Sequence, residues 1–363
     1  MARRPGHDSG HAGFDWGDYV EWLTSTAGSL AAVADRLCAA RGYKEDVGSI
    51  ERALRRLRTR GTHGGGTWGT RAIALFGLPS AIDARVRQLG QYHARLAELP
   101  VSMCEDLIRV WDKPPITESR AGRAWLAVAR ASIAVRLAKL DDAIAILDRA
   151  RADLSSASAG PTSATSSATS TSATPTSATS TRAISTSATS TSATSSPGVI
   201  AVPLAARIEA ILIRGYVASR TNLAAVPGLL DEAARLIDAV DDAYDRACLL
   251  ARLADHRAYE LNQRGEHEAA EAVYRAMRDE GPTFARTRRA NGIAYARWLR
   301  GEPDAADFAR AAIEHAGDGG HLRGRAMALR NYARIVNDAD AQTRAVAIAQ
   351  HLEDETLLGR FRR

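Results

Sequence analysis

Arginine is the residue type whose placement in this chain most clearly suggests chemistry. Residues 41–71 carry eight basic side chains against three acidic ones, an excess of five, whereas the whole 363-residue chain has a formal charge of +6. Five arginines stand close together in this stretch: Arg52, Arg55, Arg56, Arg58 and Arg60. Guanidinium groups donate paired hydrogen bonds to phosphates and carboxylates. The cluster therefore predicts an acidic partner for this part of the chain.

Sequence motifs for catalysis, cofactors and metals are missing. The chain contains no GxxxxGK[ST], HExxH or GxSxG pattern. Residues 64–69 satisfy GxGxxG, but an arginine-rich helical stretch precedes them where a dinucleotide site needs a buried strand. A turn is therefore expected there. His7 and His11 lie in a glycine-rich stretch and are weak candidates for metal ligands. We expect no enzymatic activity, no cofactor and no metal.

The cysteines and the apolar runs bear on the compartment. Cys38, Cys104 and Cys248 lie far apart, each among apolar residues at helical spacing, which indicates buried reduced thiols. No apolar run reaches the ~20 residues that a membrane span needs, and no secretory signal is visible. A cytoplasmic protein without a membrane partner is expected.

Helices of the N-terminal block must position the arginines. Three are expected within 14–61, with Ser29 as the cap of the second. The inner face of the first helix is predicted to hold Trp16, Tyr19, Val20 and Leu23. The apolar stripe of the third is Val47, Ile50, Ala53, Leu54 and Leu57. The arginines fall outside this stripe, so the third helix should present them to solvent.

The third helix resembles the recognition helix of bacterial winged helix-turn-helix regulators, over a module of about 14–76. The residues that carry the resemblance are Val47, Ser49, Ile50, Arg52, Leu54, Leu57 and Gly61. It implies binding of double-stranded DNA, with Ser49 and Arg52 nearest the bases and Arg55, Arg56, Arg58 and Arg60 on phosphates. Residues 62–77 depart from the family pattern, because they do not show a clear pair of wing strands. A small helical cap with a solvated arginine face, or an RNA or other acidic partner, remain alternatives.

Composition marks one sharp boundary further along the chain. Residues 155–196 are almost entirely Ser, Thr and Ala, with Arg182 as the one charge and Ile184 as the one bulky aliphatic residue. Such a tract cannot bury enough apolar surface to offset its chain entropy. We expect a disordered low-complexity insertion over 155–197 within one helical array.

Periodicity dominates the rest of the chain. Small or aliphatic residues recur seven apart in four segments whose first members are 36 residues apart: Ala233/Val240, Ala269/Ala276, Ala305/Ala312 and Ala341/Ile348. Each unit divides into two helices, with Gly265 and Gly301 at the turns. A fixed period of this length indicates a stacked array of helical hairpins. A related unit, with Ala143 and Ala150, precedes the tract.

This pattern resembles the tetratricopeptide repeat, over about 119–354 without the tract. The small residues, the inter-helix glycines and Pro282 at a repeat junction carry the resemblance, while the period of 36 departs from the family's usual 34. It implies an α-solenoid whose first helices line a concave face that binds a protein or peptide. The residues best placed to do so are Arg288, Asn291, Tyr295 and Trp298.

The sequence thus predicts an all-α protein: a helix-turn-helix-like bundle followed by a tetratricopeptide-like α-solenoid. Its expected parts are a disordered tail (1–13), the module (14–78), helical hairpins that begin the array (79–154), the insertion (155–197), the repeats (198–354) and a basic tail (355–363). The functional hypothesis is a DNA-binding transcriptional regulator with a protein-interaction array. An interaction scaffold without DNA binding is the alternative, and a homodimer is left open.

Overall fold

The computed structural model describes residues 13–41, 45–155, 204–278 and 281–362. These form α-helices and short 3₁₀ turns, with no strand among them, so the predicted all-α class is confirmed for this part of the chain. The predicted disordered tail and insertion lie outside the described residues, apart from Gly13 and Ser155. None of the described helices is long and apolar enough to cross a membrane.

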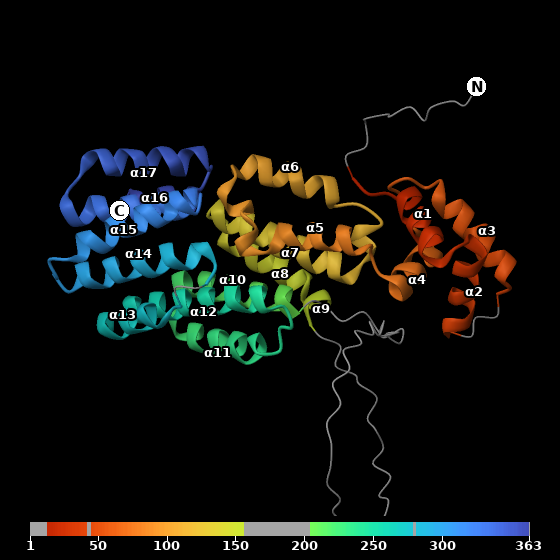
Figure 1. Ribbon diagram of the computed structural model, residues 1–363, viewed down its shortest axis with the longest axis horizontal. Coiled ribbons are helices and arrows are strands. Elements are labelled where there is room, and N and C mark those ends of the chain that lie inside the picture. The colour runs from red at the N-terminus through yellow and green to blue at the C-terminus, as the bar shows by residue number, and fades with distance from the viewer. Residues whose placement is uncertain (1–12, 42–44, 156–203, 279–280, 363) are drawn as a thin grey trace, which may run out of the picture.

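Helices α1 to α4 form a small bundle at one end of the molecule (Figure 1). They are α1 (Trp16–Ala27), α2 (Leu30–Arg41), α3 (Val47–Arg58) and α4 (Gly66–Phe76). The predicted inner face of α1 is buried, and α3 buries Ile50, Leu54 and Leu57 of its apolar stripe. Asp15, Ser29 and Asp46 cap the first three helices by accepting hydrogen bonds from backbone N–H groups of the first turn. The three predicted helices are therefore confirmed.

Helix α4 stands where a winged module would have its wing. Its first glycines make room for Trp16: a Cβ at Gly69 would lie 2.7 Å from the indole ring, and one at Gly65 would overlap it. The indole Nε1 donates to the His63 carbonyl at 2.8 Å. The glycine-rich pattern at 64–69 thus serves close packing at a helix start instead of forming only the expected turn. No wing strand exists in the described part of the module.

Helices α5 (Ser80–Gly90) and α6 (Val101–Trp111) both pack on α7 (Arg120–Arg136). A non-helical segment, 91–99, separates them and contains two 3₁₀ turns, η1 (Tyr92–Ala94) and η2 (Leu96–Glu98). Gly90 ends α5 in close contact with Trp125, and Pro100 precedes α6. Helices α5 and α6 are therefore not joined by a short turn as in a simple hairpin, because the nine residues 91–99 lie between them.

The repeat region is a row of helical hairpins. Within the described residues these are α7 with α8 (Leu140–Arg149), α10 (Leu204–Thr221) with α11 (Val226–Ile237), α12 (Ala243–Gln263) with α13 (His267–Ala276), α14 (Thr283–Leu299) with α15 (Ala305–Asp318), and α16 (Leu322–Val336) with α17 (Ala339–His351). The first helix of each hairpin packs on the first helix of the next, an arrangement consistent with an α-solenoid. Helix α7 packs directly on α10 although the short α9 (Arg151–Leu154) and residues 156–203 intervene in sequence.

The 36-residue period has a backbone counterpart at the turns within hairpins. Gly265, Gly301 and Asn337 follow α12, α14 and α16, and they adopt left-handed φ angles of 82°, 74° and 59°. Glycine and asparagine are the residues that tolerate this conformation best. The repeat length seen in the sequence is therefore the spacing of these helix-ending residues.

One predicted register is wrong. Ala269 and Ala276 were expected to let helices approach closely, but both are exposed on α13, which buries Ala270 and Tyr274 instead. The small residue at this contact is Gly292 of α14, where a Cβ would overlap the Tyr274 ring. A large aromatic side chain on α13 requires a glycine opposite it, so the local packing overrides the alanine pattern. Ala233, Ala305 and Ala341 are buried as predicted.

The C-terminal end of the array returns to its beginning. Residues 355–361, expected within a basic tail, form helix α18 (Glu355–Phe361), which buries Leu357 and Phe361 and packs on both α17 and α7. Just before it, the Leu352 carbonyl accepts a hydrogen bond from the Val101 N–H at 3.2 Å. The array is therefore closed by contacts between its two ends.

Candidate functional sites: the arginine face and the first-helix face

The arginine face of α3 lies in solvent. All five predicted arginines are exposed, while the opposite side of the helix is buried. The exposed fractions of the Arg55 and Arg58 side chains are 68% and 58%. Amphipathic packing explains the arrangement, because the leucine and isoleucine stripe must face α1 and α2. Arg52, Arg55, Arg56 and Arg58 are thus exposed on α3, and Arg60 is exposed just beyond the end of the helix.

Ser49 is half-buried at the start of α3 and links the helix cap to Arg52. Its N–H and hydroxyl donate to the Asp46 carboxylate at 2.9 and 2.6 Å, and its Oγ accepts from Arg52 Nη2 at 2.8 Å. The Ser49 hydrogen bonds lower the pKa of Asp46, so this carboxylate is ionised. Asp46 orients Ser49, and Ser49 orients Arg52.

The remaining arginines have weak partners or none. Arg55 pairs with Glu51 at 2.5 Å, Arg58 pairs with Glu21 at 2.9 Å, and Arg60 donates to the Gly64 carbonyl at 2.5 Å. Arg56 has no ion-pair or hydrogen-bond partner for its side chain among the described residues. Exposed ion pairs contribute only ~0–1 kcal/mol, so an incoming anion can replace them.

A groove runs beside the arginine face, between α1, the start of α2 and α3. Its walls combine cations, hydroxyls and a short apolar floor. It is lined by Val20, Glu21, Thr24, Ser25, Gly28, Leu30, Arg55 and Arg58. The groove therefore extends the cationic surface of α3 into a concave edge.

Glu118 joins the bundle to the array on another side. This residue of η3 (Ile116–Glu118) accepts hydrogen bonds from the Gly65 N–H at 2.5 Å and the Thr70 hydroxyl at 3.3 Å. The junction therefore uses the start of α4, and the arginine face of α3 is not covered by 79–111.

The residues predicted to bind a peptide do not form one open patch. Asn291 is buried, and its Oδ1 accepts from Asn331 at 2.9 Å. Tyr295 and Trp298 are half-buried and stack on each other with ring centroids 5.9 Å apart. Arg334 lies over the Trp298 ring at 4.4 Å. Asn291 and Trp298 therefore contact α16, the first helix of the next hairpin, and Tyr295 packs on Trp298 within α14.

Arg288 differs, because it already holds a residue of segment 91–99. Its Nη2 donates to the Tyr92 hydroxyl, and its Nη1 lies 3.4 Å from Asp255. The Tyr92 ring lies under the Arg252 guanidinium at 4.3 Å and meets Phe284 edge-on at 5.4 Å. Two cations and an aromatic side chain thus form a pocket around one phenol.

The first half of segment 91–99 is bound by carboxylates of α10 and α12. The Tyr92 N–H donates to Glu209 at 3.3 Å, and the Gln91 amide donates to Asp245 at 3.0 Å. His93 lies 3.4 Å from the same Asp245 carboxylate. Burial lowers the pKa of His93 to about 4, and Arg252 adds to the shift. His93 is therefore neutral at neutral pH.

The second half of the segment reaches α16 and α7. Arg95 donates to the Gly319 carbonyl at 3.0 Å, and Glu98 accepts from the Arg323 N–H at 2.7 Å. The Leu99 carbonyl accepts from Arg136 of α7 at 2.6 Å. Segment 91–99 thus contacts the first helices of the five hairpins, α7, α10, α12, α14 and α16. We call the surface that these helices present to the segment the first-helix face.

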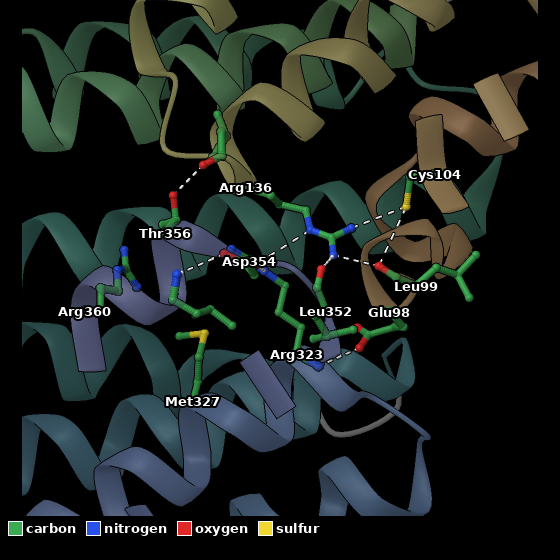
Figure 2. A network of polar contacts seen from close by, with 12 residues as sticks. Glu98, Leu99, Cys104, Arg136, Arg323, Met327, Leu352, Asp354, Thr356 and Arg360 are labelled. Atoms are coloured by element: carbon green, nitrogen blue, oxygen red, sulfur yellow. Dashed lines mark hydrogen bonds and ion pairs between the residues drawn. The ribbon is translucent and has the colours of Figure 1, made fainter. Parts of the chain in front are cut away.

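A buried network closes the array where the ends meet (Figure 2). Asp354 is fully buried between Arg136, at 3.6 Å, and Arg323, at 2.7 Å. Arg136 also donates to the Leu352 carbonyl at 2.6 Å and to Cys104 Sγ at 3.4 Å. Arg136 therefore bonds at the same time to Leu99 of segment 91–99, to Cys104 of α6 and to Leu352, which shortly precedes α18.

Apart from Arg288, the residues of these two inner groups were not singled out from the sequence. Tyr92, Arg252, Arg136 and Asp354 lie more than a hundred positions from several of their partners, and no local pattern marks them. Cys104 and Cys248 are buried free cysteines, as predicted, whereas Cys38 is only half-buried. Across the described ranges, no cluster of His, Cys, Asp and Glu is arranged to hold a metal ion.

Comparison with protein-family models, with curated proteins and with solved structures gave no match to this chain.

Proposed function

We propose that this chain binds duplex DNA through α3 and acts as a transcriptional regulator. The observation that carries the proposal is the exposed arginine face, which lies on the helix whose sequence resembles a recognition helix. Asp46 caps the start of this helix, and Ser49 and Arg52, which lie in its first two turns, meet base edges there. Arg55, Arg56, Arg58 and Arg60 meet phosphates.

The surface ion pairs support this division of roles. Phosphates replace Glu51 and Glu21 as partners of Arg55 and Arg58, at a cost of less than ~1 kcal/mol for each exposed pair. Arg56 has no such pair to break among the described residues. It is therefore the cleanest reporter of phosphate contact.

The proposal predicts a strong salt dependence of DNA binding. If each chain neutralises about four phosphates, the slope of log K against log[salt] is about −3.6, and a dimer doubles it. Fluorescence anisotropy of the full chain on labelled duplexes at a series of salt concentrations measures the slope. Fragments of the gene's own upstream region are suitable first duplexes. No binding at ~50 mM salt would refute the proposal.

Two substitutions separate phosphate contact from base reading. Arg56→Ala should weaken binding to every duplex alike and reduce the slope by about one, whereas Arg52→Ala should also cost ~1–3 kcal/mol of discrimination at one base pair. Arg310→Ala is the matched control, because that arginine is 58% exposed, like Arg58, but lies on α15. An equal loss in the Arg310 variant would mean that binding follows net charge and not the α3 face.

The second candidate is an interaction scaffold without DNA binding. It is favoured by a different observation: the first-helix face already holds an extended segment of the chain, 91–99. A chain that acts only as an interaction scaffold would show no binding to duplex DNA in the salt series above. It would still bind peptides.

A further inference from the structure

The charged groups of the first-helix face are paired within the array itself. Glu209 pairs with Arg252, and both side chains are at least nine-tenths buried. Arg288 pairs with Asp255, which also accepts a hydrogen bond from Tyr274, and Arg323 pairs with Asp354. Taking segment 91–99 away would therefore leave most of these charges with a partner. The face is preorganised to receive a ligand.

The segment itself has features of a bound ligand. Only Gln91 is buried, Arg95 is exposed, and the other residues of 91–99 are half-buried. Besides its polar contacts, its Leu96 and Leu99 side chains pack against the hydrophobic core, and its regular structure is limited to the two short 3₁₀ helices. It lies between Gly90, the last residue of α5, and Pro100, which precedes α6. A segment that replaces it must cover the same apolar surface and repeat its polar contacts.

We propose that segment 91–99 is an exchangeable internal ligand, and that the first-helix face binds an extended segment of a partner protein with the same chemistry. That chemistry is a tyrosine, an arginine three residues later and a glutamate six residues later, as in Tyr92, Arg95 and Glu98. The tyrosine enters the pocket of Arg252, Phe284 and Arg288. The arginine meets the Gly319 carbonyl and the glutamate meets the first turn of α16. This inference rests on the interaction role of the array and not on DNA binding.

Tethering determines how the exchange must be measured. A ligand linked in the same chain has an effective concentration on the order of millimolar, so a free peptide competes poorly with it. The face must first be vacated. Tyr92→Ala with Glu98→Ala removes two of the three side-chain contacts that define the proposed motif and leaves the receptor side chains unchanged.

The experiment uses a fluorescent peptide of residues 89–100 and the full chain. We expect it to bind the vacated variant at least tenfold more tightly than the native chain, as measured by anisotropy. Replacing the tyrosine of the peptide by alanine should abolish this binding. Adding Arg288→Gln to the vacated variant should weaken it at least tenfold, while adding Arg310→Gln on α15 should have no effect.

Several outcomes would overturn the proposal. A vacated variant with native helical circular dichroism that binds the peptide no better than the native chain does would refute it, as would peptide binding insensitive to Arg288→Gln. If the variant does not fold, hydrogen exchange of the native chain decides. The amides of 92–98 should exchange by local opening, well before those of α14, and exchange only on global unfolding would refute the proposal. Failure of DNA binding affects none of these results.

Discussion

At the scale of single residues, the inside of this array is unusual for the number of charges that it buries. Asp354 has no exposed surface, and Arg136 is 5% exposed. Arg136 Nη2 donates to two backbone carbonyls, Leu99 and Leu352, while its buried Nε has no hydrogen-bond partner and lies 3.6 Å from the Asp354 carboxylate. Breaking such a buried pair costs more than the pair contributes, because an unpaired charge remains.

Arg136→Met should therefore destabilise the protein by about 3–5 kcal/mol, since Asp354 would lose one of its two cationic partners in a buried site. Urea unfolding followed by circular dichroism measures this. Arg109→Met is the control: its pair with Asp106 is shorter, at 2.8 Å against 3.6 Å, but the side chains are 76% and 69% exposed. A cost below ~1 kcal/mol for Arg136→Met would show that the closure contributes little to stability.

His93 makes stability depend on pH. Its pKa falls from an ordinary 6.5 to about 4, first through burial and then through Arg252 and Arg87. The unfolded chain therefore takes up a proton that the native state excludes. Stability present above pH 6.5 should be lost as the pH falls toward 4, at about 1.4 kcal/mol per pH unit for one proton. Urea midpoints between pH 7 and 4.5 should show a shallower dependence in His93→Gln, whereas parallel curves would contradict the assignment.

At the scale of helices, the hairpins that begin with α12, α14 and α16 each combine one left-handed helix-ending residue with one small residue at a helix contact. The left-handed positions Gly265, Gly301 and Asn337 recur every 36 residues. The position of the small residue varies with the size of the side chain opposite it. It is an alanine on α11, α15 and α17, whereas between α13 and α14 it is Gly292 of α14, which lies against Tyr274 of α13.

Gly292→Ala tests this pairing. A Cβ there would overlap the Tyr274 ring, so we expect a loss of roughly 1–3 kcal/mol. Gly317→Ala on the neighbouring α15 is the matched control, because nothing lies within 4 Å of its Cβ position. There the better helix propensity of alanine should leave stability unchanged or raise it by up to ~1 kcal/mol. Equal effects of the two substitutions in urea unfolding would mean that the close helix contact is not what requires glycine.

At the scale of the whole molecule, the first helices form one continuous face that is closed by α18 against α7. The segment between α9 and α10 is not needed for that continuity, because α7 and α10 pack directly on each other. The bundle α1–α4 lies outside this closure, which leaves the arginine face accessible (Figure 1).

Deleting residues 158–194 should therefore leave the cooperative unfolding of the array nearly unchanged. The contact between α7 and α10 is retained, and loop-closure entropy changes by only ~0.6 kcal/mol for each doubling of loop length. Thermal and urea unfolding of the deletion variant should match the native chain within about 1 kcal/mol. Loss of a single cooperative transition would mean that these residues pack against the array.

The amino-acid sequence by itself determined the helices, their inner faces and the repeat length. Apolar spacing is a local property, so the buried faces of α1 and α3 and the turns at Gly265 and Gly301 could be predicted directly. The exposure of the arginines followed from the same rule, since the leucines of α3 occupy its only apolar stripe.

Only the tertiary structure decided what the array encloses. Tyr92 meets Arg288 across 196 positions, and Arg136 meets the Leu352 carbonyl across 216. Such pairs depend on how successive hairpins pack on each other, which leaves no local pattern in the sequence at these residues. The burial of Ala270 in place of the predicted Ala269 has the same origin. The bulk of Tyr274 sets the register of α13 only because Gly292 of the next helix lies opposite it. Periodicity specified each helix, and contacts between distant residues specified the site.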